Sequence, residues 1–116
     1  FLGFEYYEKA MQYFPDDSLF VVFSDRINWC KKNFKEKFPE KNFVFIEGNY
    51  GIEDLFLMSK CQSNIICNST FSWWGAYLNQ NPQKKVIVPD KWHSGGHPYP
   101  NPKENLYLPD WIGVPY

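Results

Sequence analysis

The chain has 116 residues, a length typical of one small domain. Apolar residues make up 44% of it, which is enough for a packed core and excludes a disordered segment. The formal net charge is −1 and no basic stripe occurs, so the sequence argues against general electrostatic binding to nucleic acid.

The cysteines, Cys30, Cys61 and Cys67, are odd in number and show no C-x-x-C spacing. That pattern argues against a disulfide framework or a zinc site, and we expect reduced thiols in the cytoplasm. No apolar run approaches the roughly 20 residues that a membrane-spanning helix needs, and no signal peptide is visible. Any association with the inner membrane is therefore expected to be peripheral. The chain opens without an initiator methionine, so we expect it to be part of a longer protein.

Apolar spacing predicts helices that alternate with strands over residues 1–88. The predicted helices span residues 3–14, 26–37, 52–61 and 71–79. The predicted strands span residues 18–23, 42–46, 64–67 and 84–88. This alternation indicates an α/β fold, in which βαβ units build a parallel sheet flanked by helices.

Individual residues of these elements carry further predictions. The run SLFVVF at 18–23 lacks alternation, so both faces of that strand are expected to be buried. Asp25 is placed to cap the second helix. The inward faces of the first two helices are expected to hold Phe4, Tyr7, Met11 and Phe14, and Ile27, Cys30, Phe34 and Phe38.

Residues 89–116 are rich in proline and aromatic residues and are expected to be irregular. Trp92, Tyr99, Tyr107 and Trp111 suggest that this tail wraps the domain. The same rings allow an alternative function: a non-catalytic α/β module could bind a partner through them, provided that they are exposed.

Three predicted strands are each followed by a polar triplet, at residues 24–26, 47–49 and 68–70. The carboxyl ends of parallel strands lie along one edge, where α/β proteins bind ligands. Ser69, Thr70 and Ser72 place three hydroxyls at a predicted helix start, where unpaired N–H groups attract phosphate. The same residues could also serve only as helix caps.

The other candidate residues give weaker signals. Asp25 could cap its helix or bind ribose hydroxyls, and Asp54 lies where the helix dipole favours an acidic residue in any case. Trp73 and Trp74 are expected to pack and to fix the helix that presents Ser69. His93 and His97 flank Ser94 in a glycine-rich stretch, where neither a metal site nor a nucleophile–base pair is recognisable.

Three stretches carry a resemblance to a known family: FSDRINWCKKNF, EDLFLMSKCQSNIICNSTFSWWGAYLN and VIVPDKW. In this order and spacing they resemble the C-terminal part of bacterial α-1,2-fucosyltransferases, glycosyltransferase family 11. The resemblance implies a GT-B enzyme whose C-terminal Rossmann-like domain binds GDP-fucose without a metal or other cofactor. It also implies transfer of L-fucose to a galactose hydroxyl of a glycan, with inversion. A transferase that uses another nucleotide sugar is the nearest alternative.

By the same resemblance, residues 68–72 (Asn68, Ser69, Thr70, Phe71 and Ser72) hold the donor's phosphates. Ser24 and Asp25 match the start of the family's SDD motif, and Asp54 matches the acidic residue before LMS. Arg26 replaces a second aspartate, and the family's His-x-Arg-Arg-x-Asp motif does not occur in the chain.

The absence of that motif leaves the catalytic residues unassigned. It also implies an incomplete donor-binding domain, with a core at 1–88 and a tail at 89–116. For this chain alone we expect weak GDP binding, no useful transferase activity, and self-association through an open sheet edge or gap.

Overall fold

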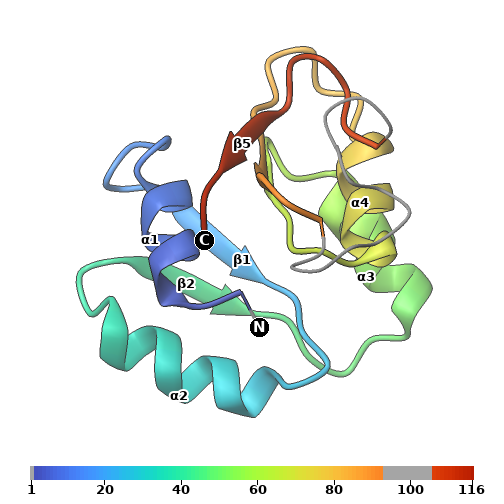
Figure 1. The fold of residues 1–116 in the computed structure, drawn as a ribbon. Helices are drawn as coiled ribbons and strands as arrows, with labels where there is room; N and C mark the ends of the chain where they lie inside the picture. The colour runs from blue at the N-terminus through green and yellow to red at the C-terminus, as the bar shows by residue number, and fades with distance from the viewer. Residues whose placement is uncertain (1, 93–105) are drawn as a thin grey trace.

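The computed structural model describes residues 2–92 and 106–116, and these residues form an α/β arrangement (Figure 1). Its helices are α1 (Phe4–Met11), α2 (Ile27–Lys37), α3 (Gly51–Ser59) and α4 (Thr70–Tyr77). Its strands are β1 (Leu19–Val22), β2 (Asn42–Phe45), β3 (Asn64–Ile65), β4 (Val86–Pro89) and β5 (Ile112–Val114). The predicted succession of helices and strands is confirmed as far as β4.

The strands belong to two separate parallel sheets. β1 pairs with β2 in one sheet, and β3, β4 and β5 follow one another in the second. The parallel direction of the strands confirms the prediction, whereas the single sheet does not form. β1 and β3 are not hydrogen-bonded to each other, because a cleft separates them.

The strand β5 corrects the prediction that residues 89–116 are irregular. Ile87 pairs with Ile112 and Pro89 with Val114, and the amide of Asp90 donates to the carbonyl of Val114 at 2.9 Å. Three residues next to Pro115 are too short a run for apolar spacing to reveal. Only pairing with β4 makes this segment a strand.

The aromatic residues of the tail that the structure describes are buried. Trp92, Tyr107 and Trp111 pack in one cluster with Ile66 and Val88. The Tyr107 hydroxyl donates to the carbonyl of Pro89 at 2.7 Å. The prediction that the tail wraps the domain is confirmed for these rings, so they cannot form an exposed partner surface; Tyr99 lies outside the described residues.

Helix α1 packs against both sheets. Its Tyr6 and Ala10 share a cluster with Ile87 of β4 and Val114 of β5. Its Met11 joins a second cluster beneath the first sheet, formed by Cys30, Phe34 and Phe38. The predicted inward face of α2 is confirmed at these three residues. The prediction for α1 missed Tyr6 and Ala10; of the residues it named, Met11 is buried and Phe4, Tyr7 and Phe14 are only half-buried.

Burial differs sharply between the two sheets. All residues of β4 are buried, as expected for a strand with a neighbour on each side. In β1, Leu19 is 59% exposed and the following residues are half-buried. The prediction that both faces of residues 18–23 are buried is therefore wrong in this structure.

Candidate ligand-binding site

A cleft of about 1440 Å³ lies between the two sheets. One wall consists of residues 17–26, which include β1, and the other of residues 60–69, which include β3. Asn49, Gly51 and Asp54 line it where β2 leads into α3. Segments that are far apart in sequence thus meet at the carboxyl ends of their strands, as the parallel order of the strands predicts.

Most of the residues predicted to bind a ligand line this one cleft. They are Ser24, Asp25, Asp54, Asn68, Ser69, Phe71 and Ser72. Thr70 does not line the cleft, although its side chain is exposed. The structure therefore brings three predicted segments together, while the ligand itself stays a prediction.

The side chain of Ser69 caps the amino end of α4. Its hydroxyl oxygen accepts a hydrogen bond from the amide of Ser72 at 3.2 Å. The amides of Thr70 and Phe71 have no protein acceptor among the described residues, as expected for the first turn of a helix. Phe71 lines the cleft, so its amide and the helix dipole give this end of the cleft a partial positive charge.

The hydroxyl hydrogen of Ser69 can be used for a ligand. Cys67 Sγ also donates to Ser69 Oγ, at 3.4 Å, so both lone pairs of that oxygen are occupied. Among the described residues, the hydrogen of Ser69 has one acceptor, Ser72 Oγ at 2.9 Å. The Ser72 hydroxyl has alternatives of its own, because the carbonyls of Ser69 and Cys67 lie 3.0 Å and 3.2 Å away. Ser69 can therefore turn its hydrogen toward a bound anion without leaving Ser72 unpaired.

Ser72 has a different place from its neighbours. It is only 6% exposed, and its hydroxyl lies among the Ser69 and Cys67 groups. A side chain in that position orients Ser69 and the first turn of α4. The sequence predicts that Ser72 contacts a ligand directly, but its side chain has little exposed surface for such a contact.

The segment after β1 is held by Ser24. Its hydroxyl oxygen accepts from the amide of Arg26 at 3.0 Å, while the Asp25 side chain is exposed. No side chain caps α2, so the prediction that Asp25 caps this helix is wrong. The Arg26 guanidinium carbon lies 5.8 Å from the centre of the Trp29 ring, and both residues line the cleft together with Asp25.

The segment after β2 adds Asn49, a residue that the prediction of site residues omitted. Its side-chain amide donates to Asp54 Oδ1 at 3.2 Å, and both residues line the cleft. Glu53 instead accepts from the amide of Tyr50 at 2.7 Å and so holds the start of α3. The polar triplet at 47–49 was the signal for Asn49, because it follows a strand as the other triplets do.

Tyr7 also lines the cleft and was not predicted to do so. Burial raises the pKa of its hydroxyl, with smaller contributions from Cys67 and Cys30. Tyr7 therefore stays neutral at physiological pH, and the inner part of the cleft carries no phenolate there.

The two tryptophans of α4 differ from each other. Trp73 Nε1 donates to the carbonyl of Leu106 at 3.0 Å, and the ring packs against the cluster that holds Trp111. The expected packing role is confirmed for Trp73. Trp74 is 48% exposed and contacts the Trp73 and Tyr77 rings, so it is not a core residue in this chain.

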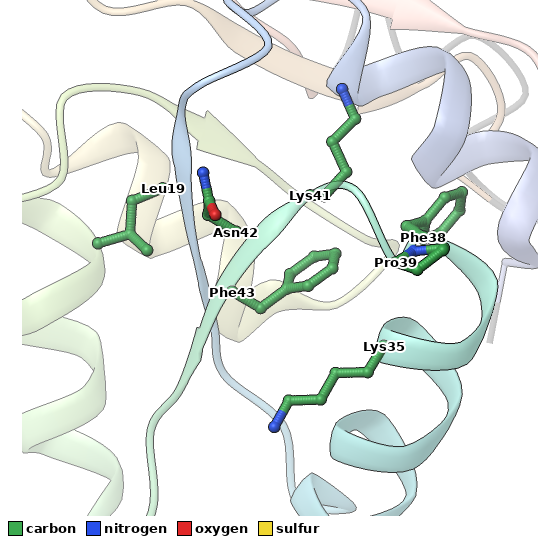
Figure 2. A pocket seen from close by; sticks show the side chains of 7 residues that line it. All are labelled: Leu19, Lys35, Phe38, Pro39, Lys41, Asn42 and Phe43. Atoms are coloured by element: carbon green, nitrogen blue, oxygen red, sulfur yellow. The ribbon is translucent and has the colours of Figure 1, made fainter.

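A second pocket, of about 620 Å³, lies at the amino ends of β1 and β2 (Figure 2). Lys35 and Lys41 lie on either side of Phe43 there and do not converge. The Lys41 ammonium is 3.7 Å from Asp16, and the Lys35 ammonium lies 5.5 Å from the centre of the Phe45 ring. No predicted site residue lines this pocket, so the cleft between the sheets remains the candidate site.

Other features add little to the site. Within residues 2–92 and 106–116, no three His, Cys, Asp or Glu side chains cluster as a metal site would require. The cysteines are free. None of the helices in the described part of the chain has the length and apolar character to cross a membrane. His93, Ser94 and His97 lie outside the described residues.

The fold and the cleft define a class: an α/β protein with a cleft that reaches the carboxyl ends of its parallel strands. Residues 3–115 match the model of glycosyl transferase family 11. The chain therefore belongs to this family.

Individual relatives agree with the family. The chain is 40% identical over 119 residues to the O-antigen biosynthesis glycosyltransferase WbnK of Escherichia coli, which covers 97% of the chain and 37% of the relative. It is 43% identical over 91 residues to an alpha-1,2-colitosyltransferase of Escherichia coli, covering 75% of the chain and 31% of the relative. It is 31% identical over 117 residues to galactoside 2-alpha-L-fucosyltransferase Sec1 of Mus musculus, covering 94% of the chain and 30% of the relative.

The chain thus spans about a third of the length of the curated relatives that it matches. No solved structure matches it significantly.

Proposed function

We propose that this chain is the nucleotide-sugar-binding part of a galactoside α-1,2-fucosyltransferase of the GT-B type. The longer enzyme transfers L-fucose from GDP-fucose to a galactose hydroxyl of a glycan acceptor, with inversion and without a metal, in the cytoplasm or at the inner membrane surface. Family membership and the names of the relatives support the reaction class. The observation that carries the proposal is the convergence of three segments on one cleft, through residues 24–26, residues 49, 51 and 54, and residues 68, 69, 71 and 72.

The geometry suggests how a pyrophosphate would be held. The Phe71 amide, which has no acceptor among the described residues, the Ser69 hydroxyl and the α4 dipole offer donors and partial positive charge to an anion at the carboxyl end of β3. When the bond between sugar and phosphate breaks, negative charge grows on the departing diphosphate, and oriented donors lower the barrier. Asp54 and Asn49, on the next segment, provide polar groups for the nucleoside.

A direct test is titration of the 116-residue chain with GDP by calorimetry or ligand-observed NMR. Ser69→Asp keeps an oxygen acceptor for the helix cap but puts a carboxylate where a phosphate would bind. We expect this variant to lose at least about tenfold in GDP affinity, because a hydrogen bond to a charged group is lost and repulsion is added.

Ser18→Ala is the matched control. It removes a hydroxyl from the amino end of the same cleft, and its GDP affinity should be unchanged. Equal GDP binding by Ser69→Asp, Ser18→Ala and the parent chain would refute the phosphate assignment. The double variant Ser69→Ala/Thr70→Ala tests the hydroxyls separately from the amides.

A different donor sugar is the second candidate. The observation in its favour is the 43% identity to an alpha-1,2-colitosyltransferase. Competition between GDP-fucose and a nucleotide-activated colitose, measured on the longer enzyme, separates the two. Preference for the second donor would change the sugar but leave the diphosphate site in place.

A further inference from the structure

The cleft between the sheets contacts the edges of two strands, not their faces. A pocket over the face of a strand is lined by alternate residues, because successive side chains point to opposite faces. Here every residue from 17 to 26 and every residue from 60 to 69 lines the cleft. Its volume of about 1440 Å³ also exceeds the roughly 300–1,000 Å³ of a small-molecule pocket. The cleft therefore has room for more than a nucleotide.

Backbone groups of both strands face this space. Val22 directs its carbonyl to β2, where the amide of Ile46 donates to it at 3.0 Å, so the neighbouring Val21 faces the cleft. Asn64 and Ile66 donate to β4, so Ile65 between them also faces the cleft. Among the described residues, the amides and carbonyls of Val21 and Ile65 have no backbone partner. Two unpaired edges thus confront each other, as they would on either side of an absent strand.

The elements around the cleft are arranged as they would be around the central strand of a parallel sheet. α1 crosses the cleft on one side: Tyr6 donates to the carbonyl of Ile66 at 2.5 Å, while Met11 packs in the cluster that holds Phe20. β3, β4 and β5 are mutually parallel, and β1 and β2 are parallel to each other. In Figure 1 the arrow of β1 points to the lower right and that of β5 to the lower left. A strand placed between β1 and β3 in the same direction would join the two sheets into one parallel sheet.

The chain enters α1 from this cleft. Leu2 lines the cleft, and Gly3, directly before the helix, has a φ of 95°. That backbone conformation is strained for residues with a side chain, and it makes a sharp turn from the cleft into α1. A strand followed by this turn, by α1 and then by β1 would be a βαβ unit, whose crossover is right-handed in nearly all known cases.

We propose that the cleft is the slot for a parallel β-strand of about five apolar residues, supplied by polypeptide that precedes Leu2 in the longer protein. The strand pairs with Val21 on one side and Ile65 on the other. The carboxyl end of the cleft, at residues 24–26 and 67–69, stays open above it. The proposal does not rest on the nucleotide-sugar function, because it uses only the strand edges and the entry to α1.

Amide hydrogen exchange tests the proposal. It is measured by NMR on the 116-residue chain and on the protein with the polypeptide that its gene encodes ahead of Phe1. In the longer protein the amides of Val21 and Ile65 should exchange at least about tenfold more slowly, because each gains a strand hydrogen bond. The ratio to Val22 and Ile66, which face existing partners, corrects for a change in overall stability. Unchanged ratios, or a gene that encodes nothing ahead of Phe1, would overturn the proposal.

Proline substitution gives a second readout. Proline is tolerated on an open sheet edge but not in a central strand. Val21→Pro should leave the melting temperature of the 116-residue chain nearly unchanged and lower that of the longer protein as much as Val22→Pro does. Tolerance of Val21→Pro in both proteins would refute the slot. Protection of Val21 and Ile65 could instead rise with the concentration of the 116-residue chain and stay the same in the longer protein. That result would assign the slot to a second copy of the chain.

Discussion

The strands β1 and β4 have similar sequences and different surroundings. β1 reads LFVV and β4 reads VIVP, and both are continuous apolar runs. β4 lies between β3 and β5 and is buried throughout, whereas β1 has β2 on one side and the cleft on the other. A continuous apolar sequence is typical of a strand with a neighbour on each side. β4 has both neighbours, whereas β1 lacks one and borders the cleft in its place.

The largest expected effect comes from a matched pair of truncations. Ile87→Ala removes a side chain that is 0% exposed in β4, and it should lower the free energy of unfolding by about 2–5 kcal/mol. Leu19→Ala, at the exposed end of β1, should cost less than about 1 kcal/mol. Urea denaturation of the 116-residue chain measures both. Equal losses of unfolding free energy would mean that β1 is as buried as β4 in solution, and would contradict the difference described between the two strands.

A smaller effect is expected from the hydroxyl that ties β3 and β4 to α1. Tyr6 donates to the carbonyl of Ile66 at 2.5 Å and lies 3.3 Å from that of Ile87. Tyr6→Phe should cost about 1–3 kcal/mol of unfolding free energy at pH 7, because a buried carbonyl loses its donor.

The same tyrosine makes stability depend on pH. Burial raises the pKa of Tyr6 far above its usual value of 10.0, with smaller contributions from Tyr7, Tyr107 and Cys67. Above pH 10.0 the unfolded chain loses this proton while the folded chain keeps it, so stability falls as pH rises. Denaturation at pH 8 and at pH 11 should show a smaller loss for Tyr6→Phe than for the parent. An identical pH dependence would mean that Tyr6 is not buried as a neutral group.

The smallest effect is expected at the open side of β1. Leu19→Lys adds a charge to an exposed strand residue and should change the free energy of unfolding by less than about 0.5 kcal/mol. If the 116-residue chain self-associates through this edge, the lysine should weaken the association, because charged side chains oppose edge pairing. Sedimentation of both proteins over a range of concentrations measures this. Strong association that Leu19→Lys leaves intact would place the contact elsewhere.

Local spacing was sufficient to predict most of the fold. Each predicted helix and each strand up to β4 exists, because apolar side chains at helical or strand spacing must reach a core. The separation of the sheets was not predictable from β1 itself, because its residues are typical of a strand with two neighbours. β5 was not predictable because its three residues become a strand only through β4.

The site was predictable to a similar extent. Polar triplets after parallel strands predicted which segments meet, and residues 24–26, 49 and 68–69 do line one cleft. The local roles were not predictable. Ser72 and Ser69 both follow the same strand, but only the hydrogen bonds in the folded chain show that Ser72 is buried and that Ser69 presents its hydroxyl.

The close packing of the two ends of the chain bears on how the protein folds during synthesis. The rings of Tyr6 and Tyr116 are 6.5 Å apart, and Val114 shares a cluster with Ala10. The core of the second sheet therefore cannot close until residues 112–116 have left the ribosome, although α1 is synthesised before them. Contacts between residues so distant in sequence form slowly. During that interval β4 is an apolar strand without a neighbour on one side, and this is the stage at which we expect the protein to be most prone to aggregate.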